Sequence, residues 1–393
     1  GLQRPARELR GLVKEKGIDD IRYYDMPARV LYGSSEREAD LRYAVRMVIP
    51  DPFFWIEKGG RTYAALGPLE IDRARRMARV NEVIPTEELV AEEGRRSDPA
   101  ELLLALARKL GFRVAEVPET FPLGIADRAG KQGLRFRIRR GPFFPERQQK
   151  SSEEIEWITE ALRIAEAGME RAREILQESR ADSEKVLRWK GGELTSERLR
   201  GEIEAVIAQR GGIAEHSIVA GGTQACDPHE QGYGPLHAGE AIVIDLFPRS
   251  QASGYYGDLS RTFVKGEPSE ALQRLYDTVS EGKRWVLERM REGVDGGALH
   301  RKLVRRFAQA GYPTLQREGR WVGFFHGTGH SLGLEIHEPP RFAAGRFRAG
   351  QVMTVEPGLY YPDIGGVRLE DLVVVEKNGV RNLTRCRETF HIP

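Results

Sequence analysis

Cysteine is scarce in this chain, which has only Cys226 and Cys386 among its 393 residues. Two cysteines that lie far apart in the sequence exclude a disulfide scaffold and form no cysteine-based metal site. Such low cysteine usage is typical of a reducing compartment, so we expect a cytoplasmic protein.

Long apolar runs are also missing. No stretch approaches the ~18 apolar residues that a membrane-spanning helix needs, so we expect no membrane partner. Residues 1–17 are charged throughout and have no apolar centre of the kind found in a signal peptide. The chain starts with Gly1 rather than Met, which suggests a processed or engineered end.

An excess of charge of either sign is absent as well. The 61 Lys and Arg residues nearly balance the 59 Asp and Glu residues, which leaves a formal net charge of +2. This balance gives no reason to expect nucleic acid or a membrane surface as a partner.

Motifs of two other enzyme classes, the Walker loop and Cys-x-x-Cys, do not occur. Residues 327–329 read Gly-Thr-Gly, but they lack the strand, helix and later acidic residue of a dinucleotide-binding fold. We therefore discount a nucleotide-binding loop at this segment.

The segment at residues 139–150 is the best domain boundary, because two prolines and a glycine interrupt regular structure there. A helix is expected directly afterwards, since Ser151 and Glu154 have the spacing of a capping box. Apolar residues then recur at steps of three and four from Ile155 to Leu176. We therefore predict a smaller α/β domain at residues 1–147 and a larger domain at residues 148–393.

Helical and strand-like patterns alternate in the larger domain. We expect helices at 195–209, 269–292 and 297–310, and strands at 240–245, 260–264, 351–355 and 371–375. The Lys-Asn-Gly sequence at 377–379 predicts a hairpin turn. In the smaller domain we expect strands at 44–49 and 62–66 and a helix at 99–110. Helices combined with hairpin-paired strands favour an α+β fold over a doubly wound parallel sheet.

Three of the eight histidines, His326, His330 and His337, lie within twelve residues and among several glycines. A lone histidine is usually a packed or surface residue, whereas three so close together indicate a functional site. The ordinary interpretation still holds for the isolated histidines, and His229 is intermediate. The isolated histidines are His216, His237, His300 and His391.

Four carboxylates flank this histidine cluster in two pairs. Asp245 and Asp258 are thirteen positions apart, and Glu356 and Glu370 are fourteen apart, so each pair can lie on adjacent antiparallel strands. Four clustered carboxylates would repel one another and raise their pKa values, unless two divalent ions neutralised them. Any one acid among 59 is more often an ordinary strand-end residue, but the set together with His330 matches a two-metal hydrolase site.

Five segments carry a resemblance to a known family: residues 242–245, 257–263, 326–339, 353–360 and 366–371. They resemble the pita-bread metallopeptidases, which include aminopeptidase P, prolidase and methionine aminopeptidase, with creatinase as a metal-free relative. Residues 148–393 match in order and spacing. The smaller domain is similar to the N-terminal domain of the aminopeptidase P, prolidase and creatinase branch, which argues against methionine aminopeptidase.

The resemblance implies a role for each matching residue. One metal would be held by Asp245, Asp258 and Glu370, and the other by Asp258, His330, Glu356 and Glu370. Glu356 would also shuttle a proton, and His337 would donate to the carbonyl oxygen of the scissile bond. His229 and His326 would line substrate pockets, and Arg368 would support the ligands or bind substrate.

The implied activity is hydrolysis of the Xaa-Pro bond at a peptide N-terminus, by an aminopeptidase or a dipeptidase. Ligation rich in carboxylates favours Mn over Co and Zn as the two divalent ions. The resemblance also implies a homodimer. Two alternatives stay open: a metal-free creatinase-like amidinohydrolase, which the five intact ligand positions disfavour, and a non-catalytic binding module on the same fold.

Overall fold

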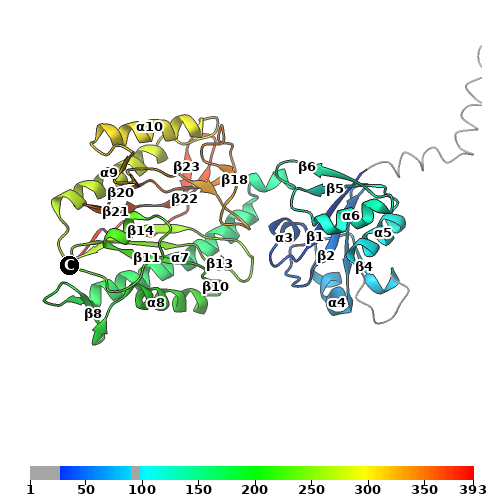
Figure 1. Cartoon of the computed structure of the whole chain (residues 1–393), viewed down its shortest axis with the longest axis horizontal. Coiled ribbons are helices and arrows are strands. Elements are labelled where there is room, and N and C mark those ends of the chain that lie inside the picture. The colour runs from blue at the N-terminus through cyan, green and yellow to red at the C-terminus, as the bar shows by residue number, and fades with distance from the viewer. Residues whose placement is uncertain (1–26, 90–97) are drawn as a thin grey trace, which may run out of the picture. The chain divides into compact units, whose positions relative to one another are not determined.

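A computed structural model describes residues 27–89 and 98–393, and the predicted lack of a signal peptide at residues 1–17 lies outside these ranges. The chain divides into two compact units, Gly1–Pro145 and Glu146–Pro393. Among the residues described, no helix combines the length and the apolar character needed to cross a bilayer. Figure 1 shows both units.

The first unit is built on one six-stranded sheet with the order β4-β3-β2-β1-β5-β6. Its strands are β1 (Ala28–Gly33), β2 (Phe53–Lys58), β3 (Arg61–Leu66), β4 (Glu82–Pro85), β5 (Val114–Pro118) and β6 (Arg135–Arg139). The helices among its described residues are α3 (Ala39–Val45), α4 (Pro68–Met77), α5 (Pro99–Leu110) and α6 (Leu123–Lys131), with a short 3-10 turn η1 (Thr86–Glu88). β1, β2 and β3 pair antiparallel, whereas β4, β5 and β6 each pair parallel to a neighbour.

Helices cover both faces of this sheet. Successive side chains of a strand point to opposite faces, so Val30 and Phe54 pack in the cluster that includes α5 and α6. Their neighbours Leu31 and Trp55 pack in the cluster that includes α3 and α4. The first unit is therefore an α/β layered domain.

Two of the three elements predicted in the first unit are confirmed. The helix predicted at 99–110 is α5, and the strand predicted at 62–66 is β3. The strand predicted at 44–49 is wrong. Helix α3 ends at Val45, and the next residue, Arg46, caps it with a left-handed backbone that has a φ of 56°. Val45, Met47 and Ile49 are all buried, so an alternation that looked like a strand comes from a helix end and the irregular segment after it.

The second unit contains four long helices: α7 (Ser152–Glu178), α8 (Ser196–Gln209), α9 (Glu270–Leu287) and α10 (Gly296–Gln309). The predicted capping box is present at the start of α7, where Ser151 and Glu154 exchange hydrogen bonds with each other's backbone N–H. Helix α9 ends at Leu287, five residues earlier than predicted. The apolar period continues because Met290, in the turn beyond the helix, is fully buried.

Two larger sheets form the centre of this unit, with the orders β11-β12-β14-β24 and β18-β17-β19-β22-β23. The first contains β11 (Ile218–Gly221), β12 (Ala241–Leu246), β14 (Leu259–Lys265) and β24 (His391–Ile392). The second contains β17 (His330–Ser331), β18 (Glu338–Arg341), β19 (Val352–Val355), β22 (Asp371–Val375) and β23 (Val380–Asn382). The predicted hairpin between β22 and β23 is confirmed.

Shorter pieces complete the unit. They are β7 (Arg180–Ala181), β8 (Leu187–Trp189), β9 (Gly192–Glu193), β10 (Gly212–Ile213), β13 (Arg249–Ser250), β15 (Leu315–Arg317), β16 (Arg320–Val322), β20 (Gly358–Tyr361), β21 (Gly365–Arg368), and the turns η2 (Pro145–Gln148) and η3 (Gly222–Cys226). Helix α7 packs on β12 and β14, and α9 packs on β19, β20 and β21. In Figure 1, α8 and α10 lie on opposite sides of the strands of this unit. The predicted α+β class is confirmed.

Candidate metal centre and active site

Strand pairing brings the four predicted carboxylates together. Asp245 in β12 lies opposite Ser260 in β14, and Asp258 directly precedes β14. Val355 in β19 lies opposite Asp371 in β22, so Glu356 and Glu370 adjoin the same end of that pair. The second pair does not come from a simple hairpin, because β20 and β21 form a hairpin of their own between the two strands.

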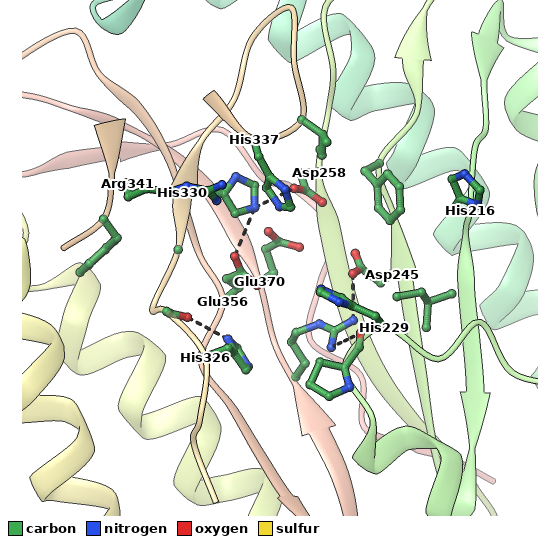
Figure 2. A pocket seen from close by; sticks show the side chains of 18 of the residues that line it. His216, His229, Asp245, Asp258, His326, His330, His337, Arg341, Glu356 and Glu370 are labelled. Atoms are coloured by element: carbon green, nitrogen blue, oxygen red, sulfur yellow. Dashed lines mark hydrogen bonds and ion pairs between the residues drawn. The ribbon is translucent and has the colours of Figure 1, made fainter. Parts of the chain in front are cut away.

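One cavity of about 970 Å³ receives every residue that the sequence singled out for chemistry. Figure 2 shows these side chains converging from both sheets and from the loops beside them. The predicted residues on its wall are His229, Asp245, Asp258, His326, His330, His337, Glu356, Arg368 and Glu370.

The tightest cluster of metal-binding groups among the described residues consists of Asp258, His330 and Glu370. One donor atom from each lies within 4.8 Å of the others, and all three residues are buried. His330 Nδ1 lies 3.2 Å from the Ser331 carbonyl, which can only accept, so Nδ1 carries the proton. Nε2 therefore presents a lone pair, 3.5 Å from Asp258 Oδ2 and 3.3 Å from Glu356 Oε1.

This arrangement raises the pKa values of three of the carboxylates. Burial, followed by the charges of Glu370 and Asp245, raises the pKa of Asp258 well above its ordinary value. Burial and the charges of Glu356 and Asp245 do the same to the pKa of Glu370. Burial raises the pKa of Glu356 to about 7. Carboxylates and the lone pair of an imidazole repel one another at these distances, so a proton or a cation must lie between them.

A divalent ion fits this donor set. Asp245 Oδ1 is buried and accepts no hydrogen bond from any residue described, although its partner Oδ2 accepts one from Arg368 at 2.8 Å. An orphaned buried carboxylate oxygen is costly unless a ligand completes it. Carboxylate oxygens with one neutral imidazole are donors that Mn, Co and Zn all accept.

Arg368, at the end of β21, organises the wall next to Asp245. Besides that carboxylate, its guanidinium donates to Ser260 Oγ at 3.0 Å, and to the Pro228 carbonyl and the Tyr360 hydroxyl, both at 3.2 Å. Several bonds to one planar group fix its orientation, and with it the orientation of the Asp245 carboxylate.

Tyr360 continues this network to His326. His326 Nδ1 donates to the Gly327 carbonyl at 2.8 Å, so its Nε2 accepts from the Tyr360 hydroxyl at 2.8 Å. Burial, together with the charge of Arg368, lowers the pKa of His326 to about 3. His326 is thus a neutral ring with a fixed tautomer.

Two supporting residues were not predicted from the sequence. Tyr360 is fully buried between His326 and Arg368. Thr354 Oγ1 accepts the His330 backbone N–H at 3.0 Å and donates to Glu356 Oε1 at 3.1 Å, so it connects two predicted ligands. The available signal for Thr354 was its position two residues before Glu356, on the same face of an extended segment.

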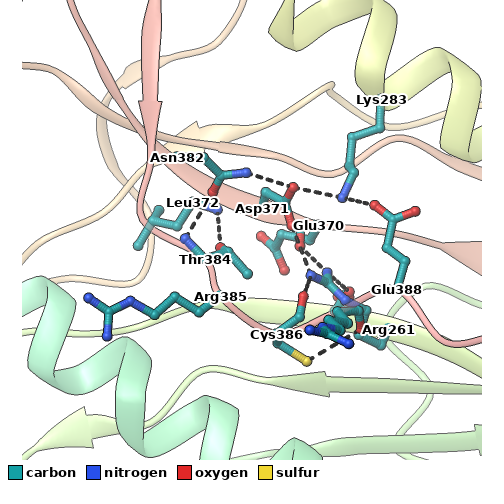
Figure 3. A network of polar contacts seen from close by, with 12 residues as sticks. Arg261, Lys283, Glu370, Asp371, Leu372, Asn382, Thr384, Arg385, Cys386 and Glu388 are labelled. Atoms are coloured by element: carbon teal, nitrogen blue, oxygen red, sulfur yellow. Dashed lines mark hydrogen bonds and ion pairs between the residues drawn. The ribbon is translucent and has the colours of Figure 1, made fainter.

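A second network lies behind Glu370 (Figure 3). The buried Arg261 donates to the Glu370 carbonyl, to Asp371 Oδ1 at 2.9 Å and to the Cys386 carbonyl at 2.6 Å. Lys283 Nζ lies 2.8 Å from Asp371 Oδ2. Burial acts to raise the pKa of Asp371, but Lys283 and Arg261 outweigh it and hold that pKa below its ordinary value. Asp371 therefore supports the backbone of Glu370 and is not a member of the cavity wall.

Comparison with known proteins places these observations in a family. The model of metallopeptidase family M24 matches residues 156–377. The chain is 30% identical over 245 residues to a Xaa-Pro dipeptidase of Pyrococcus furiosus, which covers 60% of this chain and 63% of that protein. It is 30% identical over 241 residues to the uncharacterized peptidase YqhT of Bacillus subtilis, covering 60% and 62%. The matched part is thus less than two thirds of either relative.

Solved structures share the whole architecture. A prolidase from Pyrococcus horikoshii superimposes with a TM-score of 0.74 at 24% identity, covering 96% of this chain and 97% of that one. An X-Pro aminopeptidase from Thermotoga maritima gives a TM-score of 0.79 at 22% identity, covering 95% and 100%. The expected pita-bread fold is confirmed. Since the family model spans more than half of its length, the chain belongs to metallopeptidase family M24.

Proposed function

We propose that this chain is a dinuclear metal-dependent peptidase that hydrolyses the Xaa-Pro bond at peptide N-termini. The observation that carries the proposal is the convergence of Asp245, Asp258, His330, Glu356 and Glu370 on one cavity, where Asp245 Oδ1 has no hydrogen-bond partner among the described residues. Asp245, Asp258 and Glu370 would hold one ion, and Asp258, His330, Glu356 and Glu370 the other. The preponderance of oxygen donors favours Mn.

When bound, the two ions supply Lewis acidity to the substrate carbonyl and to the attacking water. The side chains of the chain do the rest. Glu356, whose Oε1 is held by Thr354, would take a proton from the attacking water at its other oxygen and pass it to the leaving nitrogen. His337 would donate an N–H to the carbonyl oxygen as negative charge develops there.

The preference for proline has a physical basis in the cavity wall. The nitrogen of an Xaa-Pro bond carries no hydrogen, because it is part of the proline ring. The site therefore needs a flat surface for the ring, and it needs no hydrogen-bond acceptor opposite that nitrogen. Phe247, Phe325 and Ile336 provide apolar faces beside the polar groups. His229 and His326 would add ring faces to the same pocket.

We further propose that the enzyme is a dipeptidase, on the basis of Arg341. Arg341 lies on the cavity wall, at the end of β18, and its positive charge adds to burial, the main cause, in lowering the pKa values of His330 and His337. A guanidinium at this place can pair with the free carboxylate of the proline in a dipeptide. Arg341→Met should raise KM for an Xaa-Pro dipeptide and leave KM for its C-terminal amide unchanged.

The wild-type protein tests the main proposal directly. Chelation followed by dialysis should remove activity, and Mn²⁺ should restore it. Matched peptides with Pro or Ala at the second position should differ in kcat/KM in favour of Pro. Full activity without metal would support the creatinase-like alternative, equal rates for both peptides would reject the proline preference, and metal binding without hydrolysis would support a binding module.

The remaining assignments concern the chain as a whole. We propose that residues 1–147 form a creatinase-like N-terminal domain and residues 148–393 the catalytic domain of a cytoplasmic homodimer. Light scattering at micromolar concentration should give twice the chain mass of 44.3 kDa. A mass of one chain would reject the dimer.

A further inference from the structure

Lys150, two residues before helix α7, is buried beneath the strands that carry the histidine cluster. Its side chain is 1% exposed, and its Nζ lies 2.5 Å from Glu338 Oε1, 3.2 Å from Ser331 Oγ and 2.7 Å from the Arg147 carbonyl. These three acceptors use all three N–H groups of the ammonium. Lys150 therefore holds its partners in a fixed geometry.

The partners of Lys150 are the direct neighbours of two functional histidines. Ser331 follows His330 in β17, Glu338 follows His337 at the start of β18, and Ser331 and Glu338 are paired across the two strands. Neighbouring side chains in extended backbone point to opposite sides. Lys150 thus binds one side of this strand pair, while His330 and His337 face the cavity on the other side.

The two histidines are close enough for this support to matter. Their ring centroids are 4.4 Å apart in an edge-to-face arrangement. The register between β17 and β18 shifts between His330 and Ser331, and such bulges change the direction of a side chain. A small sliding of β18 against β17 would therefore change the distance and the angle between a metal ligand and a carbonyl donor.

Further contacts fix the same place. Arg147 Nη2 lies 2.5 Å from Glu338 Oε2 and 2.8 Å from Glu335 Oε2, so the Glu338 carboxylate is bound by two cations. The backbone N–H of Lys150 donates to the Gly350 carbonyl at 2.8 Å, just before β19. An added Cβ at Gly333 would lie 2.6 Å from Glu338 Oε1, so the connecting loop also passes close to this carboxylate.

We infer that Lys150 is a positioning residue that acts through Glu338 and Ser331 to set the separation and orientation of His330 and His337. This inference rests on the proposed function, in which the first histidine ligates metal and the second binds the carbonyl oxygen. Stability alone does not explain such a group, because a buried ion pair can often be replaced by neutral residues without loss of stability. A geometric role explains the group, because three directed hydrogen bonds define an orientation, whereas apolar packing defines none.

The test separates stability from geometry with one double variant. Lys150→Met leaves Glu338 with one of its two cations, and Lys150→Met/Glu338→Gln then removes the charge imbalance. Lys377→Met, at an exposed turn, is the matched control. Each protein is measured for melting temperature, for the visible spectrum and affinity on titration with Co²⁺, and for kcat with an Xaa-Pro dipeptide.

We expect the double variant to regain most of the melting temperature that Lys150→Met loses. It should nevertheless keep a shifted Co²⁺ spectrum, a weaker Co²⁺ affinity and a kcat at least about 10-fold below that of the wild type. Recovery of kcat and spectrum together with the melting temperature would overturn the inference. So would a Lys150→Met protein with the kcat and Co²⁺ spectrum of the wild type.

A milder variant covers the case in which Lys150→Met does not fold. Ser331→Ala removes one hydrogen bond without changing charge, and it should shift the Co²⁺ spectrum and lower kcat by about 2- to 10-fold. An unchanged spectrum and kcat would overturn the inference. A wild-type protein that binds no Co²⁺ and cleaves no Xaa-Pro peptide would instead reject the proposed function itself.

Discussion

Replacement of His337 by Ala is the sharpest test of how the cavity works. His337 lines the cavity next to His330, and within residues 27–89 and 98–393 its ring makes no hydrogen bond to another residue. A ring N–H is therefore available for a substrate oxygen. The variant should bind metal normally and be slow in the chemical step.

The size of the effect follows from the role and from the exposure of the ring. Loss of one preorganised donor to a developing oxyanion lowers kcat by roughly 10²–10³-fold, or ~2.7–4 kcal/mol. KM should change little, because the interaction forms mainly in the transition state. Since His337 is exposed, its truncation should change the free energy of unfolding by about 0.5 kcal/mol or less, and the melting temperature by about 1–2 °C.

The assay combines three measurements on the Mn²⁺-loaded protein: metal content, melting temperature, and kcat and KM for an Xaa-Pro dipeptide. His391→Ala, at an exposed histidine near the end of the chain, is the matched control. A variant that keeps the kcat of the wild type would refute the donor role. A fall in kcat that tracks a large loss of thermal stability would show instead that His337 only packs the fold.

Three further outcomes test the remaining roles. Glu370→Gln should lose both ions, because Glu370 is proposed to bind both. The control Glu376→Gln, at an exposed residue, should lose none. Elemental analysis that finds one ion retained in Glu370→Gln would contradict the proposal that Glu370 bridges the two ions. His330→Ala should lower metal occupancy, since it removes the imidazole of the donor set, and normal occupancy by the same analysis would remove His330 from the ligands. His326 has a pKa lowered to about 3, so its neutral form contributes stability that is full above about pH 6.5 and is lost as the pH falls toward 3. In urea unfolding between about pH 6 and 5, His326→Gln should therefore show a pH dependence shallower than that of the wild type by up to about 1.4 kcal/mol per pH unit, and parallel curves would contradict a neutral ring.

Features with local signals were predictable from the sequence. The capping box at Ser151 predicted the start of α7, and the turn at residues 377–379 predicted the hairpin of β22 and β23. The spacing of Asp245 and Asp258 predicted their adjacency, because antiparallel strands joined by a short connection place such residues together. These arguments use only residues close in the chain. The same reasoning failed at residues 44–49, where a helix end produced a strand-like alternation.

Contacts between distant segments had no such signal. Arg368 joins Asp245, Pro228 and Tyr360, and nothing in the local sequence of any of these residues identifies the others. Lys150 meets Glu338 across 188 positions for the same reason. Polar networks of this kind form only after the sheets have packed, so their members look like ordinary charged or hydroxyl residues in the sequence.

The network behind Glu370 connects the C-terminal segment of the chain to the backbone of a proposed metal ligand. Arg261, which holds the Glu370 carbonyl, is itself bound by the Cys386 carbonyl, and Glu388 lies 2.5 Å from Lys283. Beyond them, β24 pairs with β14, so its loss would expose an edge strand open to association with other chains. A stop codon or protease cut near residue 384 would therefore damage ligand geometry and solubility together, although the segment it removes contains none of the proposed ligands.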